Sequence, residues 1–268
     1  MELGWVQLIS AALGGGATVK ALDIAYQEFR QRSERSRSAR KFLDDHLDPV
    51  LKAADELVGK LRSLAESDFK SLHDVRQGSG IQDRISANTK AVAFLFAILW
   101  ARIEILNRQA LSIALSESRQ GKSLQSFLDC LESKRIRIVD RILQRAIGEL
   151  MIKDANGILS TNQFITFAKS YAVDAEVRGW LKPLLLVLSR TSHTYERQKV
   201  LQYGVVVHAF IDTLDPKHLV TRERPSFPNK LSRRSWRDLN YRVFGRYLPF
   251  VSETSKYIGP PKKSAARE

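Results

Sequence analysis

Apolar residues recur every three or four positions along most of this chain, which is the spacing of one face of an α-helix. Leu57, Leu61 and Leu64 show this spacing after Asp48-Pro49, a helix-capping residue followed by proline at the first helical position. We find no convincing strand pattern and therefore predict no β-strand. The predicted helices cover residues 49–72, 81–118, 123–151, 160–171, 176–214 and 231–247.

The centre of the second predicted helix, residues 91–101, carries no charge. A helix needs about 20 apolar residues to cross a bilayer, so this run is too short to span one. We therefore predict that it lies in a protein core. Together these segments predict an all-α fold, a bundle of long antiparallel helices with an N-terminal apolar helix.

The N-terminal apolar helix is predicted from residues 3–19, which also carry no charge. This run would span about 26 Å, slightly less than a hydrocarbon layer of about 30 Å, and continuation to Ala25 would supply the rest. Basic residues follow the run instead of preceding it, which argues against a cleaved secretory signal. A membrane anchor over residues 1–28 is the first interpretation, and a helix buried in the core or an amphipathic surface helix are the alternatives.

A basic collar over residues 29–47 follows the anchor. Positive charges beside a membrane helix stay on the cytoplasmic side and attract anionic headgroups. We therefore expect an inner- or plasma-membrane protein with its helical body, residues 48–250, on the cytoplasmic side; a soluble cytoplasmic protein is the alternative. Small residues in the apolar run would let copies associate into a homo-oligomer. The candidate headgroup-binding residues are Arg30, Arg32, Arg35, Arg37, Arg40 and Lys41.

Composition indicates a class of partner and excludes several classes of site. The formal net charge is +14, which indicates attraction to an anionic surface, either phospholipid or nucleic acid. Cys130 is the single cysteine, so the chain has no internal disulfide and no multi-cysteine metal site, and we predict neither a metal nor a cofactor. Its apolar neighbours predict that it is a small buried hydrophobe. Residues 251–268 are predicted to be a disordered polar tail.

The predicted helix 231–247 is the strongest candidate site beyond the N-terminal region. Arginine binds phosphates, and aromatic rings stack on bases or lie at the headgroup level of a bilayer. Three interpretations stay open: binding to nucleic acid, binding to anionic lipid, and a helix whose aromatic residues dock on the core while its arginines face water. The candidate residues are Arg233, Arg234, Trp236, Arg237, Tyr241, Arg242 and Arg246.

Residues 152–164 resemble the calcium loop of the EF-hand family, with Asp154, Asn156 and Gly157 at matching positions. The twelfth position is Gln163, which supplies no bidentate carboxylate, so we do not predict calcium binding. Instead we predict a turn in which Ser160 and Gln163 form a capping box for the next helix.

Arg40 and His46 have an Arg-x5-His spacing that resembles the catalytic motif of HEPN-type ribonucleases, which implies RNA cleavage by these two residues. Five histidines and many arginines make this spacing easy to meet by chance. The sequence therefore predicts first a membrane-tethered helical interaction or effector module without catalytic activity, able to form oligomers. A soluble, basic nucleic-acid-binding helical protein is the alternative, and a HEPN-like ribonuclease is the third possibility.

Overall fold

The computed structural model describes residues 26, 27, 30, 46–72, 85–109, 118–225, 227 and 230–260. The chain divides into two units, residues 1–44 and 45–268, and the fold below is that of the second unit. Apart from residues 26 and 27, the predicted anchor, residues 1–28, lies outside the described residues, as does most of the basic collar, residues 29–47.

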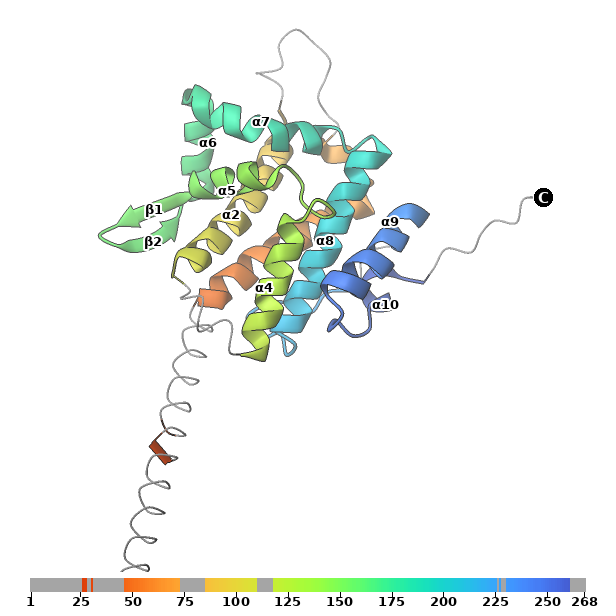
Figure 1. The fold of residues 1–268 in the computed structure, drawn as a ribbon. Helices are drawn as coiled ribbons and strands as arrows, with labels where there is room; N and C mark the ends of the chain where they lie inside the picture. The colour runs from red at the N-terminus through yellow and green to blue at the C-terminus, as the bar shows by residue number, and fades with distance from the viewer. Residues whose placement is uncertain are drawn as a thin grey trace, which may run out of the picture. The chain divides into compact units, whose positions relative to one another are not determined.

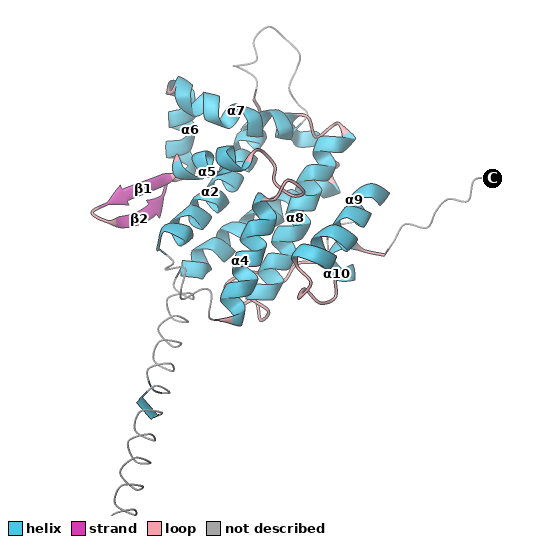
Figure 2. Ribbon diagram, viewed as in Figure 1, coloured by secondary structure: helices cyan, strands magenta, loops and turns pink. Residues whose placement is uncertain are grey.

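The described part of the chain is mostly helical, as the periodicity predicts (Figure 1, Figure 2). One small β-hairpin projects from the helices, and the element η2 is wound as a π-helix. The elements are helix 46–66, η1 (Lys70–Leu72), α2 (Ala87–Gln109), α4 (Arg119–Glu132), α5 (Arg141–Glu149), β1 (Ile152–Ala155), β2 (Ile158–Thr161), α6 (Phe164–Val173), α7 (Ala175–Ser189), α8 (Thr194–Leu214), α9 (Arg233–Arg237), η2 (Asp238–Tyr247) and α10 (Ser255–Ile258).

Helix α8 lies at the centre of this unit, with α4, α7 and α10 packed against it (Figure 1). Residues 205–211 are all buried, as expected of a helix that is apolar on every side. Tyr203 is also fully buried, and its hydroxyl accepts a 2.9 Å hydrogen bond from the Trp100 indole nitrogen on α2. The rings of Phe127 and Phe210 meet edge to face at 5.5 Å and join α4 to α8.

The prediction that residues 91–101 form a core helix is confirmed, because Val92, Phe96 and Trp100 on α2 are buried. Helix α5 crosses α2 so closely that a Cβ atom at Gly148 would lie 2.9 Å from the backbone carbonyl carbon of Trp100. Across the described ranges, no helix is both long enough and apolar enough to cross a membrane.

Three of the predicted helices are shorter than their patterns suggested. The first stops at residue 66, and Asp68 and Phe69 then take positive φ angles of 52° and 60°. The predicted helix 123–151 is divided into α4, which is capped by Ser118 instead of Ser123, and α5, which is capped by Asp140. The predicted helix 176–214 is divided into α7 and α8 by residues 190–193. Tertiary packing turns the chain at these points in spite of continuing helical periodicity.

The prediction of no β-strand is wrong. Strands β1 and β2 pair antiparallel, with Ala155 opposite Ile158, and Asn156-Gly157 makes the turn with positive φ angles of 56° and 83°. An Asn-Gly pair is the preferred two-residue hairpin turn, so the signal was present in the sequence. The predicted capping box is also wrong, because Ser160 lies in β2 and Gln163 caps α6 without a side-chain hydrogen bond.

The C-terminal region agrees with the predicted helix 231–247, which the structure forms as α9 and η2. The predicted polar tail begins too early, because Val251, Tyr257 and Ile258 are buried and residues 255–258 form α10. The Tyr257 ring packs against His208 of α8 and Phe244 of η2, and residues 261–268 lie outside the described residues.

Candidate functional site

The candidate interface on α9 and η2 is held to the body by one side of these helices. Leu239, Val243 and Phe244 are buried, and the Phe244 ring stacks on Tyr257 of α10 with centroids 6.0 Å apart. The approach to α9 is fixed by Gln198 of α8, whose side-chain amide bonds the backbone of residues 230 and 232 at 2.7 Å each. The other side of α9 and η2 is therefore presented outward in a fixed orientation.

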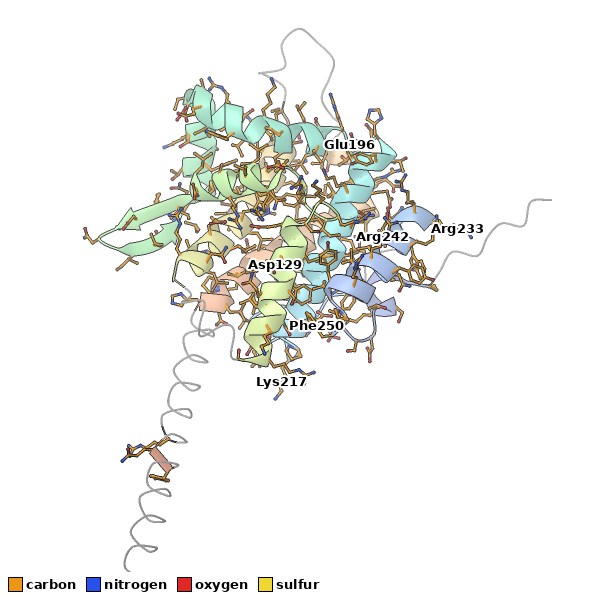
Figure 3. The ribbon with its side chains drawn as sticks, viewed as in Figure 1. Asp129, Glu196, Lys217, Arg233, Arg242 and Phe250 are labelled. Atoms are coloured by element: carbon orange, nitrogen blue, oxygen red, sulfur yellow. The ribbon has the colours of Figure 1, made fainter. Side chains whose placement is uncertain are left out.

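That outward side carries what we call the arginine face, made of Arg233, Arg234, Arg237, Tyr241, Arg242 and Arg246. All six are exposed, and Tyr241 is 66% accessible. Of the five arginines, only Arg242 has an acidic side chain of the described residues within ion-pair distance: its Nη1 atom lies 3.3 Å from Asp238 Oδ1. Figure 3 labels Arg233 on α9 and Arg242 on η2. The face thus concentrates positive charge that the described acids leave largely unneutralised.

Trp236 was also a candidate residue, but its side chain is engaged within the protein. It is half-buried, and its indole nitrogen donates a 2.9 Å hydrogen bond to the Gly259 carbonyl. Its ring meets the Tyr241 ring edge to face at 6.2 Å. Trp236 therefore positions the C-terminal segment and Tyr241.

Little of the N-terminal candidate set can be placed. Arg30 is exposed, and the other five candidate headgroup-binding residues lie outside the described residues. His46 is half-buried at the start of helix 46–66. Arg40 lies outside the described residues, so the Arg-x5-His arrangement stays a prediction.

The remaining sequence candidates have structural roles. Burial raises the pKa of the Cys130 thiol to about 12, and the prediction of a small buried hydrophobe is confirmed. Asp154 Oδ1 accepts a 2.8 Å hydrogen bond from the Gly157 amide and so stabilises the hairpin turn. In the part of the chain that the structure describes, no group of three His, Cys, Asp or Glu side chains is arranged to hold a metal ion.

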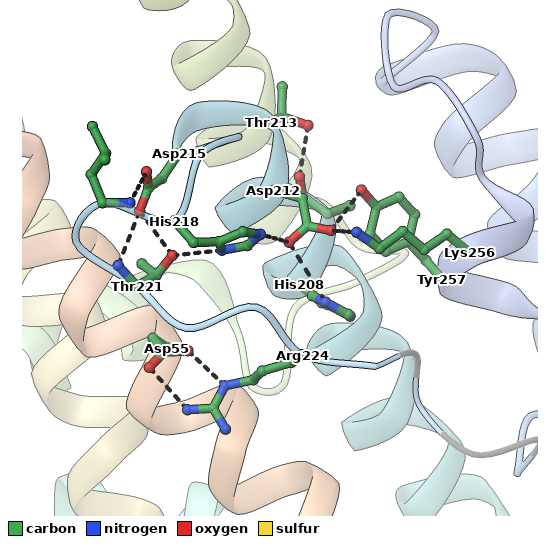
Figure 4. A network of polar contacts seen from close by, with 12 residues as sticks. Asp55, His208, Asp212, Thr213, Asp215, His218, Thr221, Arg224, Lys256 and Tyr257 are labelled. Carbon is green, nitrogen blue, oxygen red and sulfur yellow. Dashed lines mark hydrogen bonds and ion pairs between the residues drawn. The ribbon is translucent and has the colours of Figure 1, made fainter.

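The structure also contains a site that the sequence did not predict, a buried ionic cluster around Asp212 (Figure 4). The Asp212 side chain is only 7% accessible. Its Oδ2 atom lies 2.5 Å from Lys256 Nζ and accepts a 3.2 Å hydrogen bond from the Tyr257 hydroxyl. Its Oδ1 atom lies 3.7 Å from the Nε2 atoms of both His208 and His218. We call these five residues the Asp212 cluster.

His208 is the most enclosed member of the Asp212 cluster, at 1% accessible. Neither of its ring nitrogens, nor Asp212 Oδ1, has a hydrogen-bond partner among the described residues. Burial lowers the pKa of His208, although the Asp212 carboxylate opposes this shift, so the folded protein favours the neutral form of the ring. A histidine and an aspartate one turn apart in an apolar helix was the sequence signal for this site.

Two further carboxylates fix the loop that follows α8. Asp215 accepts hydrogen bonds of 2.9–3.0 Å from the backbone amides of residues 219–221 and from the Thr221 hydroxyl. Burial raises the pKa of Asp215, but these bonds outweigh burial and hold the pKa below its ordinary value. Asp55 binds Arg224 through two hydrogen bonds, of 2.6 and 2.9 Å. This pair ties helix 46–66 to the loop.

A small cavity of about 20 Å³ lies between α2, α4, α5 and α8. Trp100, Glu104, Arg145 and Tyr203 are among the residues that line it. Burial raises the pKa of Glu104, and the Arg145 guanidinium opposes that rise. The volume suits a single water molecule and is too small for an organic substrate.

The fold and these sites define a mostly helical domain with an exposed arginine face and a buried ionic cluster. Compared with known proteins, the chain matches no family model, no curated protein and no solved structure.

Proposed function

We propose that this protein is a non-catalytic helical module, tethered to a membrane by an apolar helix within residues 1–28, whose body binds anionic lipid headgroups through the arginine face. The observation that carries this proposal is the set of five exposed arginines on α9 and η2, of which the described acids pair only one. The uncharged run at residues 3–19 and the basic collar support the tether. Association of copies through the N-terminal helix is part of the same proposal.

Electrostatic attraction would dominate this binding. The apolar side of α9 and η2 packs on the body, so these helices have no second apolar side to insert into lipid. A basic side chain near an anionic bilayer contributes about 1 kcal/mol, and the effect falls off within a Debye length. Tyr241 would lie at the headgroup level, where tyrosine is favoured.

A binding role is favoured over a catalytic one by the location of the groups best suited to acid–base chemistry. Among the described residues, these groups are enclosed within the protein. His208 and Asp212 are buried, so a substrate would have to displace α10 to reach them. The cavity beside Glu104 has room for one water molecule. The exposed arginine face has neither restriction.

The test is co-sedimentation of the full chain with vesicles of neutral phosphatidylcholine, with and without phosphatidylserine. We expect binding to the anionic vesicles to fall at least about 30-fold in the double variant Arg237→Glu with Arg246→Glu, because each lost arginine contributes about 1 kcal/mol and each glutamate adds repulsion. Lys153→Glu with Lys182→Glu makes the same charge change at exposed sites on β1 and α7 and should bind like the wild type. Equal losses in the two double variants would contradict a specific role for the arginine face.

Nucleic acid is the second candidate partner, and the exposed Tyr241 ring among the arginines is the observation that favours it. Single-stranded RNA competing with the vesicles in the same assay distinguishes the two. RNA binding that is lost in Arg237→Glu with Arg246→Glu, without any binding to anionic vesicles, would replace the lipid proposal.

A further inference from the structure

The winding of η2 changes which side chains share a side of the helix. In this ten-residue segment the Leu248 amide donates a 2.9 Å hydrogen bond to the Val243 carbonyl, five residues earlier. A helix bonded in this way completes a turn in roughly four to five residues, compared with 3.6 in an α-helix. Most π-helical segments are single turns within α-helices, and they occur frequently at functional sites.

Continuous α-helical winding would divide the arginine face. Residues seven apart lie on the same side of an α-helix, so Arg242 would lie above Ser235, which is buried. Residues eleven apart also lie on the same side, so Phe244 would lie above the exposed Arg233. Arg237 and Arg242, five residues apart, would be separated by about 140° around the axis.

The observed winding removes this conflict. Arg233 and Arg237 are four residues apart, about one turn of the α-helix α9. The next intervals, five residues to Arg242 and four to Arg246, match the roughly four to five residues per turn of η2. All four are exposed, while Leu239, Val243 and Phe244 are buried. The change from α-helical winding in α9 to π-helical winding in η2 therefore keeps the four arginines on the exposed side and the apolar residues toward the body.

We propose that the π-helical register of η2 builds the lipid-binding surface, by aligning Arg233, Arg237, Arg242 and Arg246 into one row that meets the phosphate groups of a flat anionic bilayer together. A row along one side of a helix can contact a flat surface with all its members, whereas arginines distributed around the axis cannot. This inference rests on the proposed function and adds to it the residues and the register that make binding strong.

Exchanging two residues tests the register without changing the net charge or the composition. In the double variant Asn240→Arg with Arg242→Asn, position 240 is half-buried and lies outside the row, so we expect about fivefold weaker binding to phosphatidylserine vesicles. In an α-helix, position 240 would lie above Arg233 and position 242 would not lie in the row, so the exchange would leave binding unchanged or strengthen it. Arg242→Lys keeps a charge in the row and serves as the matched control, with binding close to that of the wild type.

Deletion of Asn240 is the second variant. It makes all three intervals between the arginines four residues long, which aligns them on one side of an ordinary α-helix. We expect the deletion variant to bind phosphatidylserine vesicles within about twofold of the wild type. Circular dichroism is the control that the exchange variant and the deletion variant are both folded.

The outcomes separate the two proposals. The register inference alone is overturned if the wild type binds and the exchange variant binds equally well or more tightly. It is also overturned if the wild type binds and the deletion variant does not. Failure of the wild-type chain to bind anionic vesicles overturns the proposed function and the inference with it.

Discussion

At the scale of single residues, Asp212 requires the most explanation, because a buried carboxylate is costly unless it is paired. Lys256 supplies the opposite charge and Tyr257 a hydrogen bond, both to Oδ2. His208 and His218 face the other oxygen at 3.7 Å. The cluster therefore carries one negative and one positive charge as long as both imidazoles are neutral.

Stability should fall as the solution becomes acidic because of His208. Burial lowers the pKa of its imidazole in the folded protein, so the unfolded chain takes up a proton, near pH 6.5, that the folded protein resists. The stabilising contribution is therefore complete above pH 6.5 and is lost as the pH falls below it. A proton on His208 would lie near Lys256 and Arg224, and Asp212 compensates for it only in part. We expect the Tm to decrease between pH 7 and pH 5.

The matched variant is His208→Gln, which cannot titrate. Thermal unfolding followed by circular dichroism at pH 5, 6, 7 and 8 should give a smaller loss of Tm for His208→Gln than for the wild type. Parallel losses in the two proteins would mean that other groups govern the pH dependence.

At the scale of elements, two glycines in helices have opposite surroundings. A Cβ atom at Gly148 on α5 would lie 2.9 Å from the Trp100 carbonyl carbon and 3.1 Å from the Ala101 nitrogen, both backbone atoms of α2. Around Gly179 on α7 no atom lies within 4 Å of that position, apart from the adjoining residues and the backbone of the helix itself. The first glycine allows two helices to approach, and the second only adds freedom to the unfolded chain.

The same substitution should therefore have opposite signs at the two sites. We expect Gly148→Ala to lower the free energy of unfolding by about 1–3 kcal/mol, because α2 and α5 must move apart. Gly179→Ala should raise it by about 0.5–1 kcal/mol, because alanine favours the helix and restricts the unfolded chain. Urea denaturation measures both, and a stabilised Gly148→Ala protein would show that the two helices do not need this close contact.

At the scale of the whole molecule, the C-terminal segment, residues 251–260, covers part of the core and pairs with the charge of Asp212. Val251, Tyr257 and Ile258 bury apolar surface, and Lys256 neutralises Asp212. The Gly259 carbonyl accepts the hydrogen bond from Trp236, so this segment also supports α9 and the arginine face.

Truncation tests how much this segment contributes to stability. A chain that ends at Phe250 loses the buried side chains of Val251, Tyr257 and Ile258 together with the Lys256 ion pair, and we expect the free energy of unfolding to fall by several kcal/mol, because burial of each such apolar side chain contributes about 1.5–3 kcal/mol. A chain that ends at Pro260 keeps every described contact and should unfold at the wild-type Tm. Differential scanning calorimetry gives the Tm of the wild type and of the two truncated chains. Equal Tm values for all three would show that residues 251–260 do not stabilise the protein.

Local patterns in the sequence were sufficient for the helical class, for the core position of residues 91–101 and for the helix at 231–247, because periodicity reports which side of a segment is apolar. They did not determine where the helices break. Residues 133–140 and 190–193 turn because the neighbouring helices require it, and Ile136 and Ile138 are buried at the first turn.

Contacts between distant residues were decided only by the tertiary structure. Asp55 and Arg224 are 169 positions apart, and Asp212 reaches Lys256 across a loop and two helices. The π-helical register is a tertiary outcome as well, because it turns Leu239, Val243 and Phe244 toward the body together. The sequence by itself determined which residues carry charge and which favour helices. The folded chain decided which charges are paired inside it, as Asp55 and Asp212 are, and which stay exposed, as the arginines of α9 and η2 do. The reason is that the burial of a side chain depends on all the neighbours that pack around it.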